Sequence, residues 1–117
     1  MQGLWTIEFG SSVDVYGSGV VVLREGKLQG GDASYYYVGS YDELGPAATF
    51  PAKFKARIAV KPFQPDAISV FKTYGEDFTL DLDGTFNDEN NAFAIGRPEE
   101  IPGVDVRIRM TRKAEAA

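Results

Sequence analysis

Residues 25–39 read EGKLQGGDASYYYVG, and this stretch decides the fold. Its Glu-Gly start predicts a tight hairpin turn, because Gly26 can adopt the positive φ that such a turn needs. A return strand is expected at residues 27–30, and an aromatic strand at residues 34–38 follows the Gly-Gly break. We interpret residues 39–46, which are rich in turn formers, as an exposed turn. The stretch therefore predicts antiparallel strands joined by short connections.

Alternation of apolar and polar side chains marks strands on either side of this stretch. The clearest case covers residues 47–60, where Phe54 belongs to an apolar face opposite lysine and arginine. Further strands are expected at residues 4–9, 20–24, 76–86, 92–96 and 104–110. Pro51 falls on the polar face of its strand, which indicates an edge strand or a bulge. Residues 66–71 fit a two-turn helix and an extended segment equally well.

About eight short strands without a repeating βαβ unit indicate an all-β domain with at most one short helix. Either a small antiparallel barrel or a strongly twisted sandwich satisfies this pattern. The chain of 117 residues is long enough for one domain with one core. We expect that domain at residues 1–112 and a frayed tail at residues 113–117. An up-and-down barrel of this size leaves an interior that side chains fill or that holds one small ligand.

The missing residue types exclude several kinds of chemistry. The chain has no cysteine and no histidine, which excludes disulfides, a thiol nucleophile, a Ser-His-Asp triad and the usual zinc ligands. Its net charge of −5 argues against direct contact with nucleic acid. The sequence shows neither a signal-peptide pattern nor an apolar run of membrane-spanning length. We therefore expect a cytoplasmic bacterial protein with no cofactor, no metal, no catalytic residues and no membrane contact.

The charged residues favour surface positions. Asp81 and Asp83 resemble the start of a calcium loop, but the later oxygen ligands are out of register and both aspartates share the outward face of a strand. The acidic pairs at residues 88–89 and 99–100 lie among turn formers, as expected for residues that bond their own backbone. The basic stripe at residues 107–113 fits an edge strand whose charge resists aggregation, and electrostatic contact with a partner is the alternative.

Aromatic side chains are the candidates for a binding surface. Trp5, Phe54 and Phe78 fall on the apolar faces of their strands, and Tyr35 and Tyr37 share one face of the aromatic strand. These five side chains can line the barrel interior or form a dimer face, where tyrosine is favoured. Core packing with the hydroxyls at the rim is equally consistent with the pattern.

The motif GxLxGGD at residues 26–32, followed by YxxG at residues 36–39, resembles the Grl-type repressor family. These are bacterial regulators related to the negative regulator of a type III secretion gene locus. GLW at residues 3–5 and GxGVV at residues 17–21 resemble the family too. The second half is similar only in strand spacing and around residues 80–84.

This resemblance implies a lipocalin-like β-barrel, also called calycin-like, that forms a homodimer. It also implies a negative regulator that binds a transcriptional activator without contacting DNA. The best-known member carries four consecutive acidic residues in the loop after the aromatic strand, where this chain has Asp42 and Glu43. Partner contact through these two residues is what the resemblance implies. The alternative function is a carrier or sensor that binds a small apolar ligand inside the barrel, and an enzyme using carboxylate or tyrosine chemistry comes third.

Overall fold

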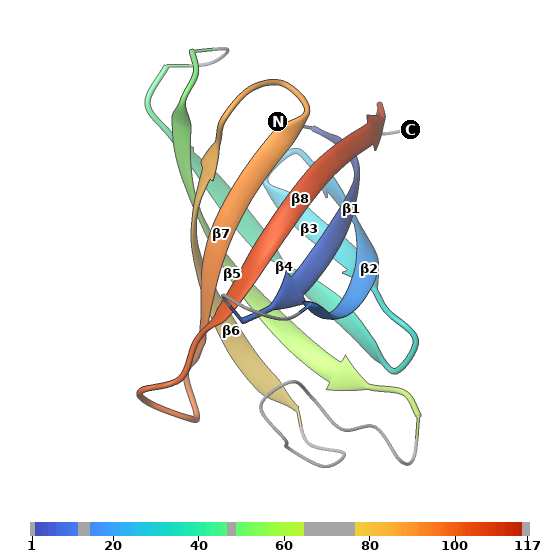
Figure 1. The fold of residues 1–117 in the computed structure, drawn as a ribbon. Coiled ribbons are helices and arrows are strands. Elements are labelled where there is room, and N and C mark those ends of the chain that lie inside the picture. Colours follow the sequence, from blue (N-terminus) through green and yellow to red (C-terminus); the bar gives the residue numbers. More distant parts are fainter. Residues whose placement is uncertain (1, 12–14, 47–48, 65–76, 116–117) are drawn as a thin grey trace.

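The computed structural model describes residues 2–11, 15–46, 49–64 and 77–115, which form eight strands and no helix (Figure 1). The strands are β1 (Gly3–Gly10), β2 (Val15–Arg24), β3 (Lys27–Gly31), β4 (Tyr35–Leu44), β5 (Ala52–Pro62), β6 (Phe78–Phe86), β7 (Asn91–Pro98) and β8 (Val106–Ala114). The two alternatives for residues 66–71 lie outside the described residues.

The strands form a closed up-and-down barrel in which every neighbouring pair is antiparallel. Pairing of β1 with β8 closes it, with Ile7 opposite Met110. The barrel prediction is therefore confirmed, and the sandwich alternative is wrong. Closure also rules out an edge strand at both places where the sequence allowed one. Pro51 lies just before β5, which has neighbours on both sides, and the basic strand β8 is likewise paired on both sides.

Two glycines of the opening stretch serve backbone geometry. The β2–β3 hairpin turns at Glu25 and Gly26, whose φ angles are 50° and 78°, and the prediction of a tight turn there is confirmed. Gly39 lies in β4 opposite Ile58, and a Cβ atom on it would overlap the carbonyl oxygen of Arg57. Only a residue without a side chain permits this close approach of β4 to β5.

Several strand bounds differ from the sequence-based expectation. β4 continues to Leu44, so the turn expected at residues 39–46 is wrong over most of its length. Burial of Tyr41 continues the alternation that starts at Tyr35, and full pairing with β5 outweighs the weak strand propensity of Gly39-Ser40. β8 runs to Ala114, two residues beyond the expected end of the domain, because β1 is there to pair with it.

The barrel core consists of the inward side chains of all eight strands. In β5, the side chains of Phe54, Ala56, Ile58 and Val60 are buried while lysine and arginine between them are exposed. This confirms the clearest alternation in the sequence. Outward charges form exposed ion pairs across β5, β6 and β7, such as Arg57 with Asp81 at 3.0 Å. Pairs of this kind contribute at most about 1 kcal/mol each, so the interior provides most of the stability.

Candidate functional site

Interior side chains divide the barrel into a packed end and a hollow end. The packed end carries both chain termini in Figure 1. There the rings of Trp5 and Phe86 lie 5.5 Å apart, and those of Phe54 and Phe86 stack at 4.5 Å. Gly84 leaves room for the Phe54 ring, since a Cβ atom at this position would overlap it. The three aromatic rings fill this end of the barrel.

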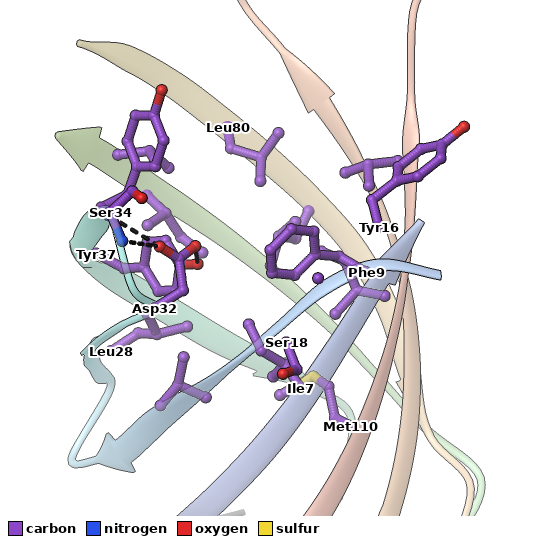
Figure 2. A pocket seen from close by; sticks show the side chains of 18 of the residues that line it. Ile7, Phe9, Tyr16, Ser18, Leu28, Asp32, Ser34, Tyr37, Leu80 and Met110 are labelled. Atoms are coloured by element: carbon purple, nitrogen blue, oxygen red, sulfur yellow. Dashed lines mark hydrogen bonds between the residues drawn. The ribbon is translucent and has the colours of Figure 1, made fainter. Parts of the chain in front are cut away.

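The hollow end contains a cavity of about 420 Å³. It lies at the end of the barrel that holds the end of β1, the turn from β3 to β4 and the start of β8, and it reaches the surface beside Tyr16 and Ala33, which are exposed. Its apolar wall comes from β1, β2, β3, β5, β6 and β8, and Figure 2 shows side chains of this lining. The apolar lining side chains are Ile7, Phe9, Val21, Leu28, Ile58, Val60, Phe78, Leu80, Leu82, Val106, Ile108 and Met110. The barrel thus has an open cavity with a mostly apolar lining.

The structure separates the predicted site residues into three groups. Tyr35, Tyr37 and Phe78 line the cavity, and the rings of Tyr35 and Phe78 meet edge to face at 6.2 Å. Trp5 and Phe54 are inward and buried, and they belong to the packed end. All five aromatic residues are therefore inward, while only three of them border the cavity.

Asp42 and Glu43 form the third group, at the opposite end of β4 from the cavity. Both are exposed, and they lie within the strand and not in a loop. Asp42 is in register with Lys55 on β5. The loop position implied by the resemblance is therefore wrong.

Asp32 is the polar centre of the cavity, although it is not among the site residues predicted from the sequence. Its Oδ1 accepts hydrogen bonds from the backbone N–H groups of Ser34 and Tyr35, both at 2.8 Å, and its Oδ2 accepts the hydroxyl proton of Tyr37. Figure 2 shows Asp32, Ser34 and Tyr37 together on one wall. The first two bonds close the turn between β3 and β4. The sequence signal for this contact is an aspartate shortly before an aromatic strand. A tyrosine five residues after it, Tyr37, lies on the inward face of that strand.

The Tyr37 hydroxyl is held in its neutral form. Burial, the hydrogen bond to Asp32 and the negative charge of Asp32 all raise the pKa of Tyr37 above its ordinary value of about 10. The neutral hydroxyl donates to the carboxylate, so both groups can only accept further hydrogen bonds.

This pKa shift predicts a pH dependence of stability. Above pH of about 10, the unfolded chain releases the Tyr37 proton while the native protein retains it. The native state then binds more protons, so the free energy of unfolding falls as pH rises. Tyr37→Phe should make this alkaline fall shallower by about 1.4 kcal/mol per pH unit. Urea unfolding between pH 9 and 12 measures the slope, with the exposed Tyr36→Phe as control. Equal slopes of the free energy of unfolding against pH in the two variants would contradict the burial of the Tyr37 hydroxyl.

The other acidic residues lie outside the cavity. Asp88 accepts hydrogen bonds from the Asn90 backbone and the Asn91 side chain, and these bonds lower its pKa. This confirms a turn role at that position. Glu99 pairs with Arg57 at 2.9 Å, and Glu100 accepts the backbone N–H of Thr79. Within the described ranges, no group of three or more acidic side chains could hold a metal ion.

No helix among the described residues is long and apolar enough to cross a membrane.

In the comparisons with known proteins, no protein-family model matches the chain and no curated protein matches its sequence. The likeness to the Grl-type repressor family therefore rests on its short motifs. In the structure, the motif at residues 26–32 forms the β2–β3 turn, β3 and the start of the turn to β4.

Proposed function

We propose that this protein is a non-enzymatic binding protein that holds a small, mostly apolar molecule inside the barrel. The observation that supports this function is the cavity at the hollow end. Its volume of about 420 Å³ lies within the usual range for small-molecule sites, about 300–1,000 Å³. A largely apolar wall with a few polar groups is the common form of such sites.

The chemistry of the lining favours binding over catalysis. General acid–base catalysis needs a group that exchanges protons near neutral pH. Asp32 already accepts three hydrogen bonds, and the pKa of Tyr37 is raised far from neutrality. The chain supplies no histidine or cysteine to take the role of base or nucleophile.

Titration with an uncharged fluorescent probe, N-phenylnaphthylamine, tests this function. The probe brightens in apolar surroundings. We expect saturable binding of one probe per chain, and we expect octanol to displace it. Linear, unsaturable fluorescence, or no change at all, would contradict a binding function.

A second candidate function is protein contact through an exposed apolar patch on the outer face of β2, β3 and β4. Val20, Val22, Tyr36 and Val38 are 36–46% exposed. Gly31 lies between Val20 and Tyr36 in the strand register, and Gln29 lies between Val22 and Val38, so the four side chains form two adjacent rows. Exposed apolar patches commonly mark protein interfaces.

The occupant that we propose for this patch is a second copy of the chain. Two copies that each carry a net charge of −5 repel one another over most of their surfaces, and the four residues of the patch carry no charge. A homodimer is also what the Grl-type resemblance implies. Because a twofold interface uses the same patch on both chains, one substitution alters it twice.

Light scattering after size exclusion tests the dimer. We expect the wild-type protein at twice the mass of one chain and Val38→Glu at the mass of one chain, because each interface would bury two unpaired carboxylates. Val104→Glu is the matched control, since Val104 is similarly exposed but outside the patch. A monomeric wild-type protein, or a dimeric Val38→Glu, would rule out this interface.

A transcriptional activator as a further partner, and negative regulation through it, belong to the same proposal. The motif resemblance supports this partner, and Asp42 and Glu43 are the residues that the resemblance implies. Their exposure on β4 leaves them accessible to a basic protein surface. The cytoplasmic location expected from the sequence is part of this proposal.

A further inference from the structure

The charge of the cavity wall constrains the polar end of the ligand. Of the described residues that line the cavity, Asp32 is the only one with a charged side chain. Apart from the hydroxyl groups of Ser18 and Ser34, the other lining side chains are apolar or aromatic, and in such surroundings electrostatic interactions are stronger than in water. A bound molecule must therefore accommodate one fixed carboxylate, and this requirement distinguishes between classes of amphiphile.

The hydrogen bonds of Asp32 determine what it can offer a ligand. Oδ1 receives two backbone N–H groups and Oδ2 receives one hydroxyl proton, so Oδ2 retains a lone pair. Tyr37 donates its only hydroxyl proton to Asp32, so its oxygen can only accept a further hydrogen bond. Together the two side chains form an acceptor pair with a net negative charge. The complementary ligand group is a hydrogen-bond donor.

The surrounding rings favour a positive charge on that donor. Phe9, Tyr35 and Phe78 border the same cavity as Asp32, and the faces of aromatic rings attract cations. The whole chain adds a net charge of −5, which raises the local concentration of cations and lowers that of anions.

We propose that the ligand is an amphiphile with a primary ammonium group, which the Asp32–Tyr37 pair binds while the apolar chain fills the cavity. This inference rests on the proposed binding function and deepens it. An alkyl carboxylate fits the same apolar wall equally well. Its charge, however, would meet Asp32 without a cation among the described lining residues to compensate it. The wall thus selects by charge among ligands of equal apolar size.

Competition between eight-carbon ligands tests this selection. Octylamine, octanol and octanoate at pH 7.5 would each displace N-phenylnaphthylamine from the wild-type protein. We expect octylamine to bind about tenfold more tightly than octanol, a difference of about 1.4 kcal/mol. Octanoate should bind more weakly than octanol.

The Asp32→Asn variant distinguishes the effect of the Asp32 charge from the effect of the net charge of the whole chain. Asparagine keeps an oxygen that can accept the Ser34 and Tyr35 N–H groups, so the turn is retained. We expect this variant to bind octylamine and octanol within about threefold of each other. Asp42→Asn, which removes the same charge at the far end of β4, should keep the wild-type preference.

Salt dependence gives a second readout that needs no variant. Octylamine binding to the wild-type protein should weaken as ionic strength rises, and octanol binding should not. If octanoate binds as tightly as octylamine, or if octylamine binding is independent of salt, the proposed ligand class is wrong although the binding function stands. If neither the probe nor any eight-carbon ligand binds, the binding function itself fails.

Discussion

Replacing Phe86 with alanine is expected to lower the free energy of unfolding by about 3–5 kcal/mol. Phe86 is fully buried and its ring contacts those of both Trp5 and Phe54, so alanine leaves a void between two large rings. A loss of this size is a large part of the stability of a typical domain, about 5–15 kcal/mol. Urea unfolding followed by Trp5 fluorescence measures it.

Phe93→Ala is the matched control for this prediction. Phe93 lies on β7 and its side chain is 39% exposed. The same truncation there should change the free energy of unfolding by less than about 1 kcal/mol. Phe86→Ala should also keep the probe affinity of the wild-type protein, because Phe86 is not among the residues that line the cavity. Equal losses of stability in the two variants would contradict the packed end.

Filling the cavity is expected to weaken ligand binding strongly. Leu80 lies on β6 and its side chain borders the cavity (Figure 2). The indole ring of Leu80→Trp should occupy the volume available to a ligand and weaken probe binding by about 100-fold, equivalent to about 2.8 kcal/mol. An inserted ring costs about 1–3 kcal/mol of stability in a close-packed core. Here we expect a smaller cost, because the space is already present.

Thr79→Trp provides the comparison, since it places the same ring on the outer face of β6 next to Leu80. Its probe affinity should remain within about twofold of the wild-type value. Val60→Phe adds a smaller ring to the same cavity and replaces Leu80→Trp if that variant does not fold. A folded cavity variant that binds the probe as tightly as the wild-type protein would show that binding occurs elsewhere.

The barrel was predictable because its signal is local. Each strand alternates inward and outward side chains, and residues such as Ile58 and Arg57 take the faces that their parity predicts. The β2–β3 turn was predictable for the same reason, since Glu25 and Gly26 form it with their own backbone angles. The end of β4 was not predictable from the local sequence. Residues 39–44 have weak strand propensity, and only pairing with β5 keeps them extended.

The cavity was predictable only in part, because alternation shows which way a side chain points but not how far along the barrel it lies. Trp5 and Tyr37 are both inward, yet one is at the packed end and the other at the hollow end. That position depends on the register between strands distant in sequence. Asp32 escaped detection because its contact with Tyr37 exists only once β4 folds back on the turn.

The location of a bound apolar ligand tests the central claim most directly. Nuclear Overhauser effects between octanol and the methyl groups of the isotope-labelled protein would show where the alkyl chain lies. We predict effects to Leu28, Ile58, Leu80 and Val106, which line the cavity, and none to the exposed Val20, Val22 and Val38. Effects confined to these three outer valines, or no effects to any methyl group at saturating octanol, would contradict a ligand site inside the barrel.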